Sequence, residues 1–382
     1  METTLPLERP DPTTPPSEYR RLQEHEPVAR VVGADGTPAW LVTSYELVAA
    51  GLADPRLGLT PPGVPADERA SLFQDGPAHA RLRRLVARAF TPRRIAELAP
   101  RIEALADEHA AALADAAADG PADLVDLLGA PLAIGSLGLL LGVALEDHPR
   151  FRVLVDDALR ADPSDPALLA EAERAWGALM GFTAELLAAA RERPGDDLLS
   201  ALVGVRDADD GRLGDGELIA LVTALLAAGV ITVRGALAVG AVHLLRAGSW
   251  EDPGDVPGLV DEIVRRAGVE VFPRWAGEDL VLGGVAIAAG EKVLLRLEAA
   301  NHDPARFPDP SALVPGRPGP HLGFGRGPHH CLGAALARVE LTAALTALSR
   351  RAPTLRLAGS VEDIPWHHGE VDSGPTMLML RT

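Results

Sequence analysis

Residues 324–333 read FGRGPHHCLG, and Cys331 within this stretch is the only cysteine among 382 residues. A lone cysteine is most often a small buried hydrophobic residue. Here, however, glycines stand at positions 325, 327 and 333, where they permit turns and close backbone approaches that a side chain would prevent. A thiolate at the start of the helix that follows would be stabilised by the helix dipole and by free backbone N–H groups. The stretch therefore indicates a sulfur ligand to iron.

The rest of the composition excludes several other classes of protein. A disulfide framework, a Cys-rich zinc site and a Cys-ligated iron–sulfur cluster each need more than one thiol. The formal net charge is −18, which disfavours nucleic acid because phosphate binding needs a concentrated basic face. The first residues, METTLPLERPDPTTPPSE, contain no basic head followed by an apolar run, so we expect neither a secretory signal nor an amino-terminal membrane anchor. We expect a cytoplasmic protein.

One apolar stretch needs a separate explanation, because residues 127–145 carry no charge over about the length of a membrane span. Four glycines and one proline interrupt this stretch, and charged residues stand directly before and after it. A glycine-broken segment satisfies its backbone polar groups more easily inside a protein than in lipid. We therefore predict buried helices here and no membrane span.

Hydrophobic periodicity predicts a mainly α-helical fold with small β-sheets. Apolar residues recur at intervals of three and four in segments 94–117, 168–193 and 332–348, which predicts amphipathic helices. Segment 217–246 is apolar on nearly every side, as expected of a helix about 45 Å long that is surrounded by protein. Strand patterns are fewer: VARVVG, AWLVTS and the glycine-punctuated segment 279–296. Because no linker or repeat divides the chain, we expect residues 1–382 to form a single domain.

The pattern F-G-x-G-x-H-x-C-x-G at residues 324–333 resembles the haem-binding loop of the cytochrome P-450 family. The resemblance implies a single large helical domain around a buried haem b (iron protoporphyrin IX). In that fold Cys331 would be the axial metal ligand, with Phe324 and Gly333 shaping its surroundings. Thiolate donation raises the electron density on iron and favours cleavage of the O–O bond. His330 has no role in the pattern, and we expect it to pack.

A second matching pattern is E-x-x-R, formed by Glu262 and Arg265. On its own this spacing is weak evidence, because a solvated i,i+3 pair occurs in almost any helix. The resemblance implies instead a buried salt-bridged unit that also contains Arg317.

A third pattern, in segment 75–92, is similar to the family's D-P-P-x-H-x-x-x-R and places His79 and Arg83 one helical turn apart. That spacing can aim both side chains at one acceptor, as a haem propionate requires. The resemblance adds Arg274 and His329 as further propionate partners. The alternative for the first two residues is an ordinary surface His/Arg pair.

The central helix departs from the family pattern A-G-x-(acid)-T-T, because residues 228–233 read AGVITV. Gly229, which the resemblance links to space for dioxygen, and Thr232, which it links to proton delivery, are retained. Ile231 replaces the acid and can neither carry nor orient a proton. Protons would then come through ordered water at Thr232 or from a polar group of the substrate. An alternative is that Thr232 only bonds the carbonyl four residues back, and we expect Arg234 to face away from the haem.

These patterns predict a soluble bacterial haem-thiolate monooxygenase or oxidase that tailors a small-molecule or peptide intermediate of natural-product biosynthesis. No reductase sequence follows the haem-binding pattern, so we expect ferredoxin and ferredoxin reductase to supply electrons to a monomer. Four arginines near the thiolate loop offer a docking surface for an acidic redox protein, with a merely solvated charged face as the alternative. They are Arg81, Arg84, Arg88 and Arg326.

Two other functions stay open. The missing acid at Ile231 suggests oxidative coupling, in which C–C or C–O bonds form without oxygen insertion. The third possibility is a non-catalytic member that recruits a carrier or binds a ligand. Segments 58–73, 150–195 and 366–376 are expected to line the substrate pocket.

Overall fold

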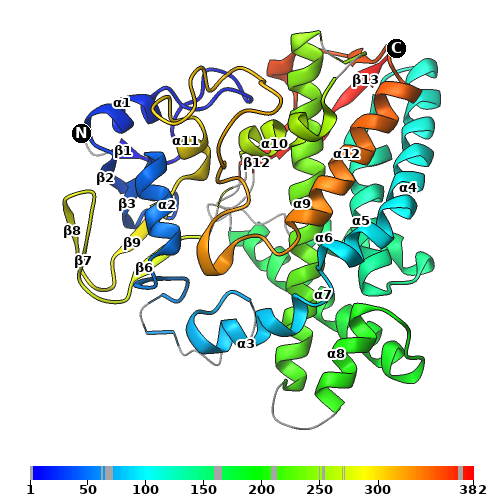
Figure 1. The fold of residues 1–382 in the computed structure, drawn as a ribbon, viewed down its shortest axis with the longest axis horizontal. Coiled ribbons are helices and arrows are strands. Elements are labelled where there is room, and N and C mark those ends of the chain that lie inside the picture. Colours follow the sequence, from blue (N-terminus) through cyan, green and yellow to red (C-terminus); the bar gives the residue numbers. More distant parts are fainter. Residues whose placement is uncertain are drawn as a thin grey trace.

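The computed structural model describes residues 3–61, 63–64, 72–158, 166–207, 213–248, 250–251, 254–268, 270, 272–368 and 373–382. Long helices occupy one half of the molecule, and the larger sheet with its short helices occupies the other (Figure 1). The predicted fold class, mainly α with small β-sheets, is confirmed.

The α-helices of the described residues are α1 (Glu18–His25), α2 (Tyr45–Ala53), α3 (Gly76–Val86), α4 (Pro92–Asp119), α5 (Ala130–Leu141), α6 (His148–Ala158), α7 (Pro166–Glu192), α8 (Leu198–Asp207), α9 (Asp215–Ala247), α10 (Val256–Arg266), α11 (Leu297–Asn301) and α12 (Ala334–Arg351). The strands are β1 (Thr3–Thr4), β2 (Val28–Val32), β3 (Pro38–Val42), β4 (Leu57–Gly58), β5 (Ala122–Asp123), β6 (Arg274–Ala276), β7 (Leu280–Leu282), β8 (Val285–Ile287), β9 (Lys292–Leu295), β10 (Arg356–Leu357), β11 (Trp366–His368), β12 (Ser373–Pro375) and β13 (Met379–Arg381).

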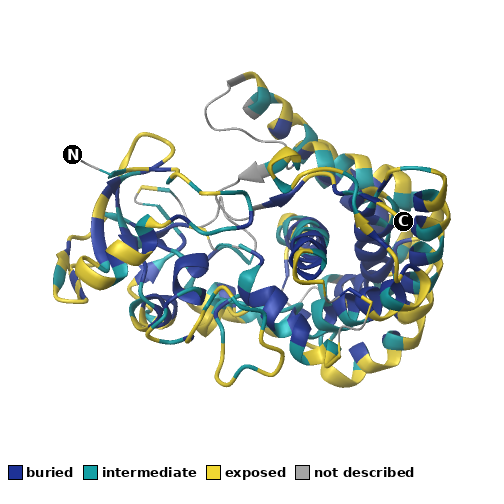
Figure 2. Ribbon diagram, turned by 90° about the horizontal axis from the view of Figure 1, so that it is seen from above, coloured by how far each residue is buried: buried dark blue, intermediate teal, exposed yellow. Residues whose placement is uncertain are grey.

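Helix α9 forms the axis of the helical half. It has 33 residues and is therefore about 50 Å long. Seen end-on in Figure 2, it lies in the middle of the molecule with a largely buried ribbon. By length and composition α9 could cross a membrane, but 56% of its apolar window is buried inside the protein. Core helices of soluble proteins pass the same test, so this property is weak evidence for a membrane span.

The apolar stretch 127–145 is also helical, as predicted. A π-helical turn, Val125–Gly129, runs directly into α5, and nearly all residues of α5 are buried. Gly142 ends α5 in the left-handed conformation (φ 91°) that favours glycine. The stretch does not stay buried to its end, because the side chain of Leu145 is 74% exposed.

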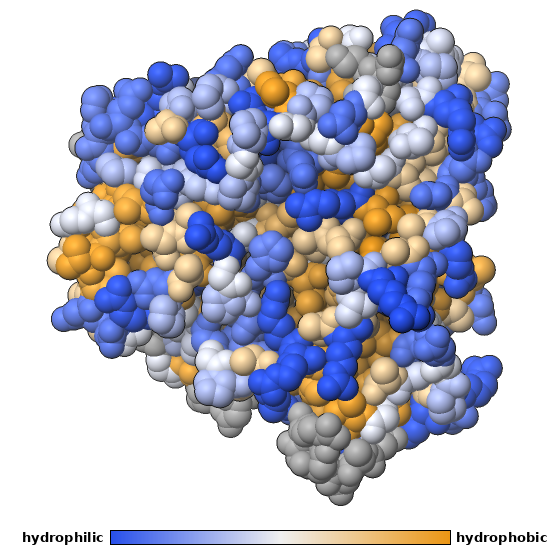
Figure 3. Space-filling view, in the orientation of Figure 1, coloured by the Kyte–Doolittle hydropathy of each residue, from blue (hydrophilic) through white to orange (hydrophobic). Residues whose placement is uncertain are grey.

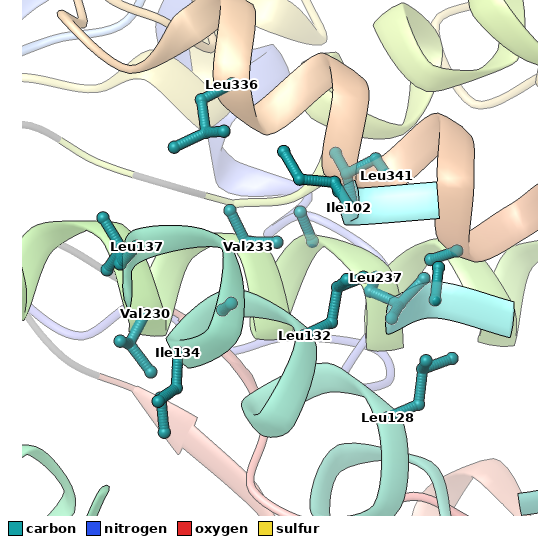
Figure 4. Close-up of a cluster of buried hydrophobic side chains, with 14 of the residues drawn as sticks. Ile102, Leu128, Leu132, Ile134, Leu137, Val230, Val233, Leu237, Leu336 and Leu341 are labelled. Atoms are coloured by element: carbon teal, nitrogen blue, oxygen red, sulfur yellow. The ribbon is translucent and has the colours of Figure 1, made fainter. Parts of the chain in front are cut away.

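The largest core cluster fills the space between α4, α5, α9 and α12. In the close-up of Figure 4, side chains of α5 lie beside those of α9, and side chains of α12 and α4 approach from the opposite side. The labelled members are Ile102, Leu128, Leu132, Ile134, Leu137, Val230, Val233, Leu237, Leu336 and Leu341. This packing relates α9 directly to α12, the helix that follows Cys331.

The main sheet has the strand order β1-β2-β3-β9-β6-β4. It joins the amino-terminal hairpin, predicted from VARVVG and AWLVTS, to strands far away in the sequence, with Trp40 opposite Val293 in a parallel pair. Segment 279–296 forms β7, β8 and β9, and Gly283 and Gly284 turn the β7–β8 hairpin with φ values of 58° and 83°. Strand β6, which carries Arg274, was not predicted.

The Glu262–Arg265 pair is buried, and the expected unit with Arg317 is confirmed. Arg265 donates to Glu262 from Nε (2.8 Å) and Nη2 (3.0 Å), and Arg317 Nε lies 3.1 Å from Oε2 of the same carboxylate. Arg265 also donates to the carbonyl of Asn301 (2.7 Å). These bonds fix α10 against the segment that leads into the cysteine loop.

Candidate active site

The cysteine loop takes its shape from glycine. Gly325 and Gly327 have φ values of 67° and 74°, which L-residues with side chains rarely adopt. A Cβ atom on Gly327 would also lie 2.7 Å from the carbonyl oxygen of Leu52, so the loop can touch α2 only with glycine there. The loop closes where the backbone N–H of Cys331 donates to the carbonyl of Phe324 (2.8 Å).

Cys331 is exposed rather than packed into the apolar core, which excludes the small buried hydrophobe as its explanation. Protein atoms still surround the sulfur closely, and this burial raises the pKa of the Cys331 thiol. The backbone N–H of Gly333 and the charges of Arg83 and Arg338 act in the opposite direction and favour the thiolate. The thiol is accessible to a ligand and has the hydrogen bond and cations that a metal-bound thiolate needs.

Phe324 is half-buried at the entrance to the loop. The guanidinium of Arg338 lies 4.4 Å from the centroid of its ring. Arg338 is itself held by Asp261 of α10 (2.9 Å). His330 is exposed, with its ring centroid 6.5 Å from that of Phe324, so it does not pack into the core as expected.

Three predicted residues from distant segments meet around Asp75. His79 lies on α3, His329 in the 3-10 turn before Cys331, and their ring centroids are 4.1 Å apart. Nε2 of His329 lies 3.0 Å from Oδ1 of Asp75. Arg274 of β6 is 3% exposed, and its charge acts on both Asp75 and His79.

The electrostatics of this cluster follow from burial and from its excess of cationic groups. Burial, and then the neighbouring His329 and Arg83, lower the pKa of His79 to about 4. Burial also lowers the pKa of Arg274. Burial raises the pKa of Asp75, but hydrogen bonds from His329 and from the backbone of Leu59 lower this pKa below its usual value. His79 is therefore neutral at pH 7, and an added anion would favour its protonated form.

These residues fit a haem with two propionates. Nε2 of His79 is buried without a hydrogen-bond partner. The side chain of Arg274 is buried and, within the described part of the chain, forms no hydrogen bond or ion pair, so that only the charge of Asp75 acts on it from further away. A buried guanidinium is stable only when an anion compensates it. His79 and Arg274 are therefore suited to bind carboxylates. The space beside Gly333 is open as well, because a Cβ atom there would meet nothing within 4 Å.

Arg83 has a different position from the other three predicted propionate partners. Its guanidinium donates to the backbone carbonyl of His330. Arg83 therefore lies next to the thiolate loop, where its charge favours the ionised form of Cys331.

Asp75 is a residue of this site that sequence reasoning missed. It holds His329 in place and accepts a hydrogen bond from the backbone N–H of Leu59 (2.6 Å). The available signal was its position four residues before His79, at the first letter of the D-P-P-x-H pattern.

The face of α9 that carries Thr232 is accessible, although this helix runs through the interior. Ala228 is exposed, and Ile231 and Thr232 are half-buried. The Thr232 hydroxyl donates to the carbonyl of Ala228 (3.0 Å), which is the alternative foreseen for an isolated threonine. Gly229 packs closely on α5, because a Cβ atom there would lie 2.7 Å from Leu137. Close packing of α9 on α5 is sufficient to explain this glycine.

Residues around Thr232 tie α9 to two neighbouring elements. Arg234 forms an ion pair with Asp156 of α6, which explains how an arginine is tolerated in an apolar helix. Gly374 of β12 lies against Gly235 of α9. A Cβ atom on Gly374 would be 3.4 Å from the Cα atom of Gly235. Segment 366–376 thus contacts α9 close to Thr232. Parts of the three expected pocket segments, namely 62, 65–71, 159–165 and 369–372, lie outside the described residues.

Three of the four arginines of the predicted docking surface are exposed to solvent. They are Arg84, Arg88 and Arg326. Arg81 forms an ion pair with Glu217, which neutralises part of the expected positive charge.

In the space-filling view of Figure 3, apolar surface crosses the middle of the face shown, with hydrophilic regions above and below.

Comparisons with known proteins agree with this site. A sequence profile of the cytochrome P-450 family matches residues 258–351, which include the Glu262–Arg265 pair and the Cys331 loop. The mycinamicin IV hydroxylase/epoxidase of Micromonospora griseorubida is 41% identical over 380 residues, with 94% of each chain covered. The nocardicin C N-oxygenase of Nocardia uniformis subsp. tsuyamanensis is 39% identical over 381 residues, again with 94% of each chain covered.

The similarity extends to solved structures. SgvP, a protein involved in the tailoring step of griseoviridin, matches with a TM-score of 0.90 at 37% identity, and the match covers 100% of both chains. Full-length similarity of this kind, together with an accessible thiol and a cationic cluster that requires carboxylates, leaves one conclusion. The chain belongs to the cytochrome P-450 family of oxidoreductases and has the fold of that family.

Proposed function

We propose that this protein is a soluble, cytoplasmic haem-thiolate monooxygenase of a single domain that tailors a small-molecule intermediate of bacterial natural-product biosynthesis. The observation that carries the proposal is the combination of an accessible Cys331 with the unpartnered Nε2 of His79 and the buried guanidinium of Arg274. Relatives that hydroxylate, epoxidise or N-oxygenate natural products support the reaction class.

The residues of the site divide into two groups. Cys331 would ligate the iron of haem b, and the Gly333 N–H and Arg83 favour its thiolate form. His79, Arg274 and His329 would bind the propionates, with Asp75 orienting His329. When bound, the haem supplies the activation of dioxygen with externally provided electrons.

Proton delivery is the step in which this chain departs from its family. The single hydroxyl proton of Thr232 is donated to Ala228, so its oxygen remains only an acceptor. Thr232 can hold a water molecule or a substrate hydroxyl, but it cannot replace the acid that Ile231 lacks. We infer that a polar group of the substrate or a chain of water supplies the protons.

Electrons would come from a ferredoxin and its reductase. The exposed Arg84, Arg88 and Arg326 provide positive charge near the thiolate loop, where an acidic redox protein would dock. Charge steering of this kind predicts that electron transfer slows as ionic strength rises.

The test is reconstitution with haem, a ferredoxin and its reductase, and a panel of candidate metabolites screened by the haem absorbance. A product that gains one oxygen atom supports monooxygenation. Failure of the purified chain to retain haem would instead support the non-catalytic alternative.

Oxidative coupling is the second candidate, and the apolar Ile231 is the observation that favours it. Formation of a bond between two substrate atoms by hydrogen abstraction needs less proton delivery than insertion of oxygen. SgvP, which resembles this chain over its whole length, carries an assignment as a thioether synthase. A product that has lost two hydrogen atoms and gained no oxygen would establish coupling.

A further inference from the structure

A cavity lies at the carboxyl end of α9, away from Thr232. Its volume is about 570 Å³, and it is lined by α9, α10, the amino-terminal residues Thr13 and Thr14, and segment 311–315. His243, which lines it, lies 11 residues after Thr232 on the same helix, about 17 Å along the axis.

Two buried polar groups of this cavity have no partner. His243 is 7% exposed, and its ring atom Nε2 forms no hydrogen bond. Nε of Arg266, the last residue of α10, is likewise buried without a partner. Within the described ranges, Arg266 forms no ion pair. Unpartnered buried groups of this kind are rare in native proteins because each costs free energy.

The other charged side chains that line the cavity, Arg246 and Asp255, already have hydrogen-bond partners. Arg246 lies 3.6 Å from Asp11 and donates to the hydroxyl of Thr13 (2.9 Å). Asp255 caps the start of α10 by accepting from the backbone N–H of Gly258 (3.1 Å).

Behind Arg266, two cations, Arg265 and Arg317, share the single carboxylate of Glu262. This group of side chains therefore carries more positive than negative charge, and within the described ranges no anion is in contact with the guanidinium of Arg266.

The ionisation of the two unpartnered groups defines what they can bind. Burial, and then the adjacent Arg265, lower the pKa of Arg266 to about 10, which still leaves it protonated at pH 7. Burial, and then Arg266, lower the pKa of His243 to about 3, so its imidazole is neutral. The cavity therefore offers one positive charge and one neutral hydrogen-bonding ring.

We propose that this cavity binds a small organic carboxylate, with Arg266 pairing with the carboxylate and His243 donating to it. A carboxylate can accept hydrogen bonds from both unpartnered groups, and its single charge can pair with Arg266, whereas a phosphate dianion would add a second negative charge to a cavity that the carboxylate of Asp255 already lines. The rest of the lining contains both polar and apolar residues, and its apolar part would receive a short hydrocarbon body. The apolar members are Leu244, Ala247, Leu259, Ala312, Leu313 and Pro315. The volume lies within the range of small-molecule sites.

Titration calorimetry of the haem-loaded full chain with hexanoate tests the proposal, with the haem absorbance recorded in parallel. We expect binding of hexanoate without a matching absorbance change, and binding about tenfold weaker or more in Arg266→Gln, as for loss of a charged hydrogen bond. Arg101→Gln, at an exposed position of α4, is the matched control and should bind as the native chain does. Hexanol and inorganic phosphate should bind more weakly than hexanoate.

A second variant covers the case in which Arg266→Gln fails to fold. Ala247 is exposed at the end of α9 and lines the cavity, so Ala247→Trp should fold, fill the space and abolish binding. Unchanged hexanoate binding in either folded variant overturns the proposal. So does an absorbance change that saturates together with the heat, because hexanoate would then be in the active site. Tighter binding of phosphate than of hexanoate would overturn the carboxylate assignment.

Discussion

The ring centroids of His79 and His329 lie 4.1 Å apart, although one residue belongs to α3 and the other to the loop of Cys331. Nε2 of His329 is occupied by Asp75, while Nε2 of His79 has no partner. The two histidines therefore differ in what they can do: one is already oriented, and the other is free to bind a carboxylate.

Replacement of His79 by Phe should weaken haem binding while leaving the fold intact, because the ring is kept and only the hydrogen bond to a propionate is lost. We expect haem to dissociate about 10 to 100 times faster, as for loss of a charged hydrogen bond. The measurement is transfer of haem to an excess of an acceptor protein. Arg88→Gln, at an exposed position, is the control. An unchanged rate in His79→Phe would place the propionates elsewhere.

Replacement of Cys331 by Ala should remove the thiolate ligand. The red-shifted carbon monoxide absorbance of thiolate-ligated ferrous haem should disappear, while the exposed neighbour His330→Ala should retain it. Persistence of that band in the Cys331 variant would show that the assignment of the ligand is wrong.

Replacement of Glu262 by Gln should destabilise the protein by about 3 to 5 kcal/mol, because Arg265 and Arg317 would lose their shared buried anion. Denaturant unfolding measures the effect, with the exposed Glu103→Gln on α4 as the control. Equal midpoints for the two variants would contradict a structural role of the buried network.

Replacement of Ile231 by Glu tests the missing acid. If proton supply is limiting, Ile231→Glu should change the ratio of peroxide released to NADPH consumed, and Ile231→Leu should not. Thr232→Ala should have a smaller effect than in relatives that retain the acid. A collapse of coupling in Thr232→Ala alone, with no effect of Ile231→Glu, would restore an ordinary threonine-centred relay.

The pH dependence of stability should show the buried His243. Its pKa is lowered to about 3 in the folded chain, against about 6.5 when unfolded. The unfolded state therefore binds the proton more readily, and the free energy of unfolding should fall as pH drops from about 6.5 towards 3. The limiting slope is about 1.4 kcal/mol per pH unit for one site. Chemical unfolding at a series of pH values should give a shallower slope for His243→Gln than for the exposed control His25→Gln.

Sequence reasoning located most of the helical half and the metal ligand, because both have local signals. The periodicity of 217–246 is a property of neighbouring residues, and α9 extends it by only a residue or two at each end. Residues whose partners lie far away in the sequence were harder to place. Asp75 meets His329 only after the chain has folded, and Arg83 turned out to contact the His330 carbonyl. Pairing of distant groups is set by tertiary packing, which a periodic pattern does not record.

The approach of Gly327 to the carbonyl of Leu52 also bears on how the protein is made. The loop that carries Cys331 rests on α2, which leaves the ribosome long before the loop is made. The haem pocket is therefore completed only when these two distant segments come together. Firm binding of the cofactor accordingly follows synthesis of the Cys331 loop.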